Sequence, residues 1–360
     1  MGLLMYLLIY IITVMLIIDN RIIPSRLFFL FWFTVMVCLS LSIRWTLIQG
    51  SEVSAESDLG AVVMNMRIEQ GVISYHLREP VFWYGIRYLH KVIGNPGLVF
   101  VVMDVVLFLT FYKSVGLFQR FFLNHINFHN VKYLYFGAFL IYPYLAGMHN
   151  HYRQILAVTI AMYAFGITDK KLVKSLFAFL ISIAIHNAMI ILLPILFLAG
   201  KRKISSSLMT LIGLAIIFVA VVPLTAVFFG YDSWYEINRR LSQVGVRDTF
   251  SARNVIYLGL LIFATLFVIT VEFTSKRKAH YLLIVVLIYL TVLYCFSLWA
   301  FPEQGSSRIF FIVLTLLYLL LGLYVETKFK TEPTVRLLYF HLLLVPLMGL
   351  RGDGLVYNFG

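Results

Sequence analysis

The sequence predicts an all-α, polytopic integral membrane protein whose 360 residues form a single transmembrane domain (1–360). Of these residues, 61% are hydrophobic and only 12% are charged, and the mean hydropathy is +0.92. A soluble domain usually carries about twice that share of charged residues. Apolar runs recur along the whole chain, each long enough to cross a hydrocarbon core of about 30 Å as a helix, so about 11–12 transmembrane helices are expected.

The first apolar run, at 2–18, has no basic segment before it and no small-residue cleavage site, so we expect a retained helix instead of a signal peptide. The expected spans follow the apolar runs in order: 2–18, 27–43, 97–112, 133–147, 152–167, 172–185, 187–200, 205–229, 254–271, 281–301, 309–325 and 335–350.

The basic residues occur in short clusters between these spans, for example at 170–174, 201–203 and 276–278. With the N-terminus outside, every inner loop is basic, as the positive-inside rule requires. This pattern accounts for the net charge of +13 and argues against nucleic acid as a partner. Cys38 and Cys295 both lie within apolar runs, so neither a disulfide framework nor a zinc site is expected. Nucleotide and zinc-hydrolase motifs are absent from the sequence, and we expect no cofactor and no metal.

Residues 172–200 need a break, because lysine-rich clusters flank them on both sides and one straight helix would place one cluster outside. We expect two short helices that turn near His186-Asn187. A single helix kinked at Pro194 is the alternative, and it would invert one half of the topology.

Two long outer loops are expected, at about 44–96 and 230–253. The first contains an amphipathic helix from Pro80, with Phe82, Ile86, Leu89 and Ile93 on one face, which predicts a helix on the membrane surface. In the second, the run 233–236 fits a helix capping box.

Polar residues converge on the outer face in this topology. Arg153 opens an apolar helix, where it either snorkels to the interface or binds an anion through its planar fork. His186 lies among apolar residues and serves either as a hydrogen-bonded packing group or as a general base. Glu79 precedes Pro80 and is either a helix-dipole partner or a carboxylate that activates a sugar hydroxyl. Asp104 lies within a span with no second charge near it in the sequence, so we interpret it as a hydrogen-bonded structural group.

Several short motifs link these candidate residues. Arg153-Gln154 with Ala157 is followed by Asp169-Lys170-Lys171 and by an apolar run into Ile185-His186-Asn187. Asp58 and the Glu79-Pro80-Val81-Phe82 stretch lie in the first outer loop, and Ser306-Ser307-Arg308 precedes a late span. These motifs resemble the EpsG-like branch of Wzy-type polysaccharide polymerases, which has Phe-His-x-Ser at the histidine and acidic positions in its first outer loop.

This resemblance implies a glycosyltransferase that joins undecaprenyl-diphosphate-linked oligosaccharide units at the outer face of the bacterial inner (cytoplasmic) membrane. It implies that arginines hold the leaving diphosphate and that Glu79 or His186 takes the proton of the acceptor hydroxyl, with no metal. Membrane lipid and a chain-length regulator are the other expected partners. The expected diphosphate ligands are Arg153, Arg308, Arg253 and Arg247. The expected acceptor or sugar contacts are Asp58, His149, His151, Trp83 and Tyr84.

Three other functions fit parts of the pattern. A lipid-linked oligosaccharide flippase would place Arg or Lys well inside several spans, whereas the outer arginines here cluster at span ends. A membrane-bound O-acyltransferase would need His186 near the cytoplasmic side. An O-antigen ligase shares the donor and differs only in the acceptor, so the sequence separates it poorly from a polymerase.

Overall fold

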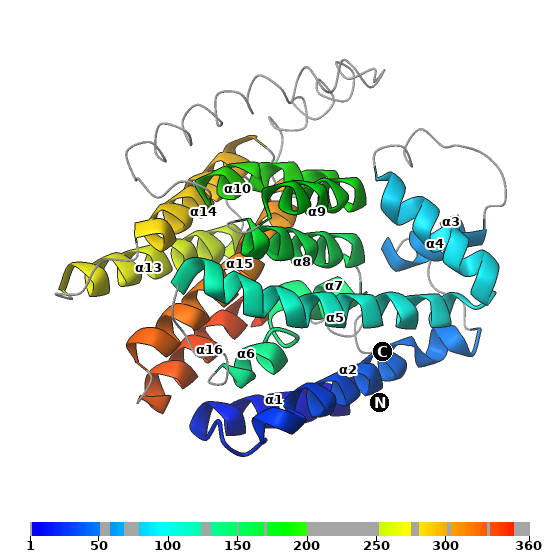
Figure 1. Ribbon diagram of the computed structural model, residues 1–360, viewed down its shortest axis with the longest axis horizontal. Helices are drawn as coiled ribbons and strands as arrows, with labels where there is room; N and C mark the ends of the chain where they lie inside the picture. Colours follow the sequence, from blue (N-terminus) through cyan, green and yellow to red (C-terminus); the bar gives the residue numbers. More distant parts are fainter. Residues whose placement is uncertain are drawn as a thin grey trace. The chain divides into compact units, whose positions relative to one another are not determined.

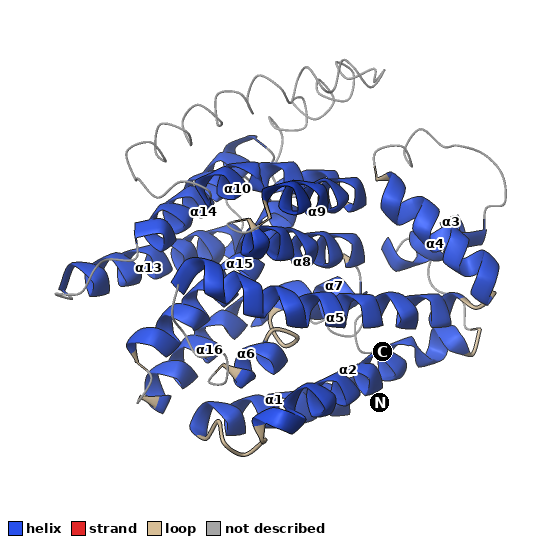
Figure 2. Ribbon diagram, viewed as in Figure 1, coloured by secondary structure: helices blue, strands red, loops and turns tan. Residues whose placement is uncertain are grey.

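The computed structural model describes residues 2–50, 58–67, 79–123, 131–149, 151–168, 171–199, 252–274, 281–300, 304–329 and 332–348. All regular secondary structure in these ranges is helical (Figures 1 and 2). Within them, four helices are long and apolar enough to span a membrane, at 25–48, 96–118, 255–273 and 309–328, and shorter apolar helices lie at further expected spans. The predicted all-α, polytopic membrane fold is therefore confirmed.

The chain divides into two compact units, Met1–Met189 with Tyr318–Gly360, and Ile190–Leu317. In the first unit α5 (Pro96–Leu123) packs against α2 (Ser25–Ile48) and α8 (Tyr152–Ile167), and α8 packs against α9 (Leu172–Ile185) (Figure 1). Around this core lie α1 (Gly2–Ile18) and α16 (Pro333–Met348), which contact each other. The second unit contains α10 (Leu193–Ala199), α13 (Ala252–Thr274), α14 (Tyr281–Ala300) and most of α15 (Gln304–Lys328), and there α13 packs against α14.

Helices α8 and α9 form an antiparallel pair joined at 168–171. Ser182 Oγ of α9 donates to the carbonyl of Ala157 in α8 at 2.9 Å, and Ser175 Oγ donates to the carbonyl of Ala164 at 2.8 Å. Within a membrane, polar side chains of this kind need hydrogen-bond partners in the protein, and the two serine hydroxyls find them in backbone carbonyls. They fix the register of the pair, so that the start of α8 lies beside the end of α9.

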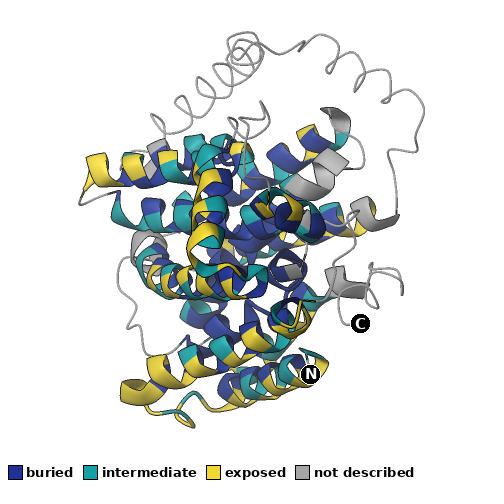
Figure 3. Ribbon diagram, turned by 90° about the vertical axis from the view of Figure 1, so that its right-hand side faces the viewer, coloured by how far each residue is buried: buried dark blue, intermediate teal, exposed yellow. Residues whose placement is uncertain are grey.

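The outward sides of several helices are apolar and exposed, as the yellow stretches of Figure 3 illustrate. Leu4 on α1 and Val173 on α9 are 74% and 80% exposed, and Phe177 is 65% exposed. An apolar surface of this extent is unfavourable in water and is what lipid tails cover. The surface therefore agrees with a multi-pass membrane protein.

The expected span 133–147 is not one helix, which corrects the sequence prediction. It consists of α6 (Lys132–Gly137) and α7 (Tyr142–His149), separated by turns. Pro143 lacks an N–H, and its ring would clash with the carbonyl four residues earlier, so a helix from α6 cannot run through it. Residues 131–148 are all buried, and irregular backbone at membrane depth is tolerated where protein surrounds it.

The helix break expected near His186-Asn187 is confirmed. Helix α9 ends at Ile185, His186 is extended with φ −150° and ψ 111°, and a 3₁₀ segment η3 (Asn187–Leu192) leads to α10. Pro194 lies in the first turn of α10, where its missing N–H costs nothing. The single helix kinked at Pro194 is thus wrong.

The amphipathic helix expected from Pro80 is present as α4 (Pro80–Ile93), but its apolar face meets protein. Phe82 and Ile86 are only 2% and 1% exposed, and α4 packs against α3 (Asp58–Arg67), α5 and α9. The interpretation of this face as membrane-facing was wrong, because the long-range partner α9 could not be read from local periodicity. The span at 205–229 and the capping box at 233–236 lie outside the described residues.

Candidate active site

Glu79 occupies the residue before α4 and does not cap its own helix with its side chain. Its backbone carbonyl accepts from Trp83 N at 3.1 Å, and Pro80 fills the first helical position, where no N–H is needed. The carboxylate is thereby left to reach other elements. It contacts the first turn of α8 through Arg153 and the end of α9 through His186.

Arg153 Nη1 donates to Glu79 Oε2, and His186 Nδ1 lies 2.5 Å from Glu79 Oε1. Arg153 and His186 lie 74 and 107 positions after Glu79 in the sequence, and both contact its carboxylate. We call these three residues the Glu79 cluster. Glu79 is 5% exposed and His186 6%, so both groups are shielded from bulk solvent.

The environment of the Glu79 cluster favours the ionised carboxylate. Burial by itself raises the pKa of Glu79, but the hydrogen bond and charge of His186, together with those of Arg153, outweigh it. The pKa therefore lies below its ordinary value of 4.5. An arginine in the first turn of a helix faces the unfavourable end of the helix dipole, and the Glu79 anion offsets that cost.

Aromatic rings hold the arginine from the other side. The guanidinium carbon of Arg153 lies 5.0 Å from the centre of the Trp83 ring and 5.9 Å from that of Phe82, which are cation–π distances. Trp83 is 2% exposed, so the structure places its ring beneath Arg153 instead of leaving it open to a sugar. Tyr84, the next residue, is 40% exposed and keeps an accessible ring.

His186 has one nitrogen engaged and one not. Its Nδ1 faces Glu79, whereas Nε2 is buried and finds no hydrogen-bond partner in the part of the chain that the structure describes. A buried polar atom without a partner costs free energy, and such atoms concentrate where a substrate supplies the missing partner. The arrangement supplies an oriented imidazole with an available nitrogen.

The other predicted site residues are placed less closely. His151 precedes α8 and is half-buried. Asp58 is the first residue of α3 and His149 is the last residue of α7, and the side chains of these two residues lie outside the described part of the structure. Arg253 and Arg308 lie in α13 and α15, in the second unit, and their side chains are likewise not described. Arg247 lies outside the described residues. Their expected roles stay predictions.

Sequence reasoning missed one charged residue in the first unit. Arg44 was assigned to the long outer loop, but α2 continues to Ile48 and buries Arg44 at 1% exposure against Asp104. The signal was present in the sequence, because the apolar run Trp45-Thr46-Leu47-Ile48 extends the helix past the arginine. Asp104 is hydrogen-bonded by Ser40 and Arg44, in agreement with its interpretation as a structural group.

Comparison with known proteins adds to this geometry. The fold and the site define a polytopic helical membrane protein with a buried carboxylate, an arginine and a histidine gathered at helix ends. The family model of the EpsG family matches residues 58–350. The chain belongs to the EpsG family, and this membership associates it with polysaccharide biosynthesis. Neither a curated protein nor a solved structure matches the chain.

Proposed function

We propose that the protein is a polysaccharide polymerase that joins undecaprenyl-diphosphate-linked oligosaccharide units, with the Glu79 cluster as its active site. The observation that carries this proposal is the His186 imidazole, which one carboxylate orients and whose second nitrogen has no partner. Membership of the EpsG family supports the polysaccharide chemistry. O-antigen and exopolysaccharide units both fit this scheme.

His186 acts as the general base, and Glu79 orients it. In this scheme the Nδ1–H group donates a hydrogen bond to the Glu79 carboxylate, and the lone pair of Nε2 accepts a hydrogen bond from the acceptor hydroxyl. The acceptor oxygen bonds to the anomeric carbon of the donor, the bond from that carbon to the diphosphate oxygen breaks, and the hydroxyl proton moves to Nε2. The Glu79 anion stabilises the imidazolium that forms, as in other carboxylate–histidine pairs.

Arg153 stabilises the leaving diphosphate. Its side chain is 15% exposed, more than those of its partners, and its Nη1 donates to Glu79. A cation fixed before the reaction costs no reorganisation as negative charge develops on the leaving group. Arg308, Arg253 and Arg247 stay candidate diphosphate ligands on the strength of the family resemblance.

Charge placement supports an extracytoplasmic site. Lys171 and Lys174 lie at the start of α9, whereas His186 follows its end, about 20 Å away along a helix of this length. The positive-inside rule assigns the lysine end to the cytoplasm. The Glu79 cluster then faces the outer leaflet, where lipid-linked units are displayed for polymerisation.

The flippase alternative is less well supported. It requires uncompensated cations inside the spans, but each buried cation described in the first unit has a partner. Arg44 pairs with Asp104, Arg336 pairs with Glu326, and Lys132 Nζ donates to the carbonyls of Asn20 and Ile23.

A reconstituted reaction tests the proposal. The purified protein in detergent receives the lipid-diphosphate-linked repeat unit of its host, without added nucleotide or metal, and the products are separated on a gel. We expect a ladder of longer glycans from the wild type and from Arg26→Ala, which replaces an exposed arginine in the first turn of α2, and none from folded Arg153→Ala.

Other outcomes would overturn the proposal. A single transfer to a different acceptor, without a ladder, would identify a ligase. No product from authentic substrate, with translocation of the substrate in liposomes, would identify a flippase. A ladder that survives Arg153→Ala would keep the enzyme and remove this arginine from its active site.

A further inference from the structure

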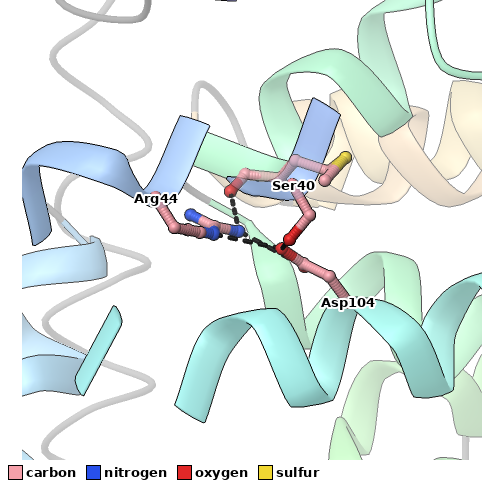
Figure 4. Close-up of polar contacts among 4 residues, drawn as sticks. Ser40, Arg44 and Asp104 are labelled. Carbon is pink, nitrogen blue, oxygen red and sulfur yellow. Dashed lines mark hydrogen bonds and ion pairs between the residues drawn. The ribbon is translucent and has the colours of Figure 1, made fainter. Parts of the chain in front are cut away.

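A second buried ion-paired cluster lies outside the proposed active site. Ser40 Oγ donates to Asp104 Oδ2 at 2.7 Å, and Arg44 donates to the same carboxylate through Nε at 3.2 Å and Nη2 at 3.4 Å (Figure 4). Arg44 Nη2 also donates to the carbonyl of Met148 at 2.6 Å. We call Ser40, Arg44 and Asp104 the Arg44 cluster, which joins α2, α5 and α7.

Net stability is a weak explanation for this cluster. Arg44 is 1% exposed and Asp104 is 0% exposed, so both charges are fully desolvated. The cost of removing two charges from water is often as large as their attraction, and apolar replacements of similar volume are frequently neutral or stabilising. What such a pair does supply is a fixed geometry between the elements that carry it.

The Arg44 cluster adjoins the segment that carries Arg153. Met148 lies in the last turn of α7, and the guanidinium carbon of Arg44 lies 5.9 Å from the ring centre of Tyr152, the residue directly before Arg153. The Phe100 ring, 4.8 Å away, closes the other side. The entry into α8 is therefore held against α2 and α5 by a hydrogen bond and by aromatic packing.

One turn further along α2, the same helix holds the C-terminal end of α4, the helix that Glu79 precedes by one residue at its other end. The carbonyl of Ile48 accepts from Asn95 Nδ2 at 2.9 Å, and Asn95 lies between α4 and α5. Gly97 approaches Ile48 so closely that an added Cβ would lie 2.5 Å from Ile48 N. The end of α2 thus contacts both the residues that follow α4 and the residues that precede and begin α8.

We propose that the end of α2, through the Arg44 cluster and the Ile48–Asn95 hydrogen bond, positions Glu79 against Arg153. Arg44, Asp104 and Asn95 are positioning residues that need not touch substrate. Displacement of a catalytic group by about 1 Å can cost roughly 100-fold in rate, so a positioning role has a measurable consequence for catalysis. The effect on rate rests on the proposed function, whereas the effect on the ionisation of Glu79 does not.

The test uses the double variant Arg44→Met/Asp104→Leu in the full-length protein. It removes both charges at similar volume, so we expect a melting temperature close to that of the wild type. We expect kcat to fall by about 10- to 100-fold. In infrared difference spectra, with the Glu79 band assigned by Glu79→Gln, the carboxyl should become protonated at a higher pH than in the wild type.

The matched control is Arg336→Met/Glu326→Leu, which removes another buried pair in the same unit, held at 3.4 Å between α16 and α15. It should change neither kcat nor the titration of Glu79. Should the first double variant not fold, Asn95→Ala tests the other contact by the same two readouts. A folded variant with wild-type rate and wild-type Glu79 titration would overturn the positioning role. A missing glycan ladder in the wild type would count only against the polymerase, because the infrared titration needs no substrate.

Discussion

The Glu79 cluster and the Arg44 cluster contain similar chemical groups but differ in how far those groups are shielded from solvent. Each pairs an arginine with a carboxylate and adds a third polar side chain. In the Arg44 cluster the carboxylate and its arginine are at most 1% exposed, and among the described residues Arg44 Nη1 has no hydrogen-bond partner. In the Glu79 cluster Arg153 is 15% exposed, and His186 Nε2 has no partner among the described residues.

This difference shows how one motif can serve structure in one place and chemistry in another. A carboxylate that is closed off from solvent together with its arginine can hold its neighbours in place but cannot meet a substrate. A carboxylate that orients a histidine with an available nitrogen leaves a reactive atom for a substrate. The two clusters therefore make different predictions for single substitutions. Loss of His186 should lower the rate, whereas loss of Asp104 alone should lower stability, because it leaves Arg44 as an unpaired buried charge.

Replacement of His186 by Ala should have the largest effect. Loss of the base is expected to lower the initial polymerisation rate by about 10²–10⁴-fold. The fold is expected to be retained, because only the contact of Nδ1 with Glu79 is lost and Arg153 still pairs with that carboxylate. His90→Ala, a half-buried histidine of α4, is the control and should keep the wild-type rate. A rate within a few fold of the wild type in His186→Ala would remove the base from the Glu79 cluster.

Replacement of Asp104 by Asn should show the opposite behaviour, with stability lost first. Arg44 would remain as a buried cation without its counter-charge, which costs about 3–5 kcal/mol. Thermal unfolding in detergent, followed by tryptophan fluorescence, measures this loss. An unchanged unfolding temperature would mean that the charge of Arg44 does not depend on Asp104 for its compensation.

Replacement of Arg153 by Lys tests whether the Glu79 cluster needs only a positive charge at this position or also the planar guanidinium group. Lysine keeps the positive charge but lacks the planar donors that hold Glu79 and stack on Trp83. We expect about a tenfold lower rate, with a smaller loss of stability than in Asp104→Asn. Steady-state kinetics at saturating donor, compared with Arg153→Ala, gives the answer. Equal rates for Lys and Arg would reduce the role of Arg153 to its charge alone.

The smallest expected effect is a pH dependence of stability that belongs to Glu79 alone. Because its folded-state pKa lies below 4.5, its contribution is fully present above that pH and is lost as the pH falls through the folded-state value. The melting temperatures of wild type and Glu79→Gln should therefore differ at neutral pH and converge in acid. A gap that stays constant down to acid pH would show that Arg153 and His186 do not favour the ionised form of the Glu79 carboxylate.

The sequence allowed much of the fold to be predicted because local patterns determine it. Apolar length located the helices, and the lysine clusters around 172–200 required the break that the structure places at His186. Glu79, Arg153 and His186 were each identified as candidates, but no local pattern indicates that they meet across 74 and 107 residues. For the same reason the partner of Asp104, 60 residues away, and the face of α4 that contacts α9 were missed.

The pairing of Arg44 with Asp104 has a consequence for how the chain enters the membrane. Synthesis delivers α2 first, with a cation near its end, and Asp104 follows only 60 residues later within α5. Until then Arg44 must reach towards the headgroups, because a lone charge in hydrocarbon is costly. Arrival of α5 neutralises it and draws both helices together while the later helices are still being made.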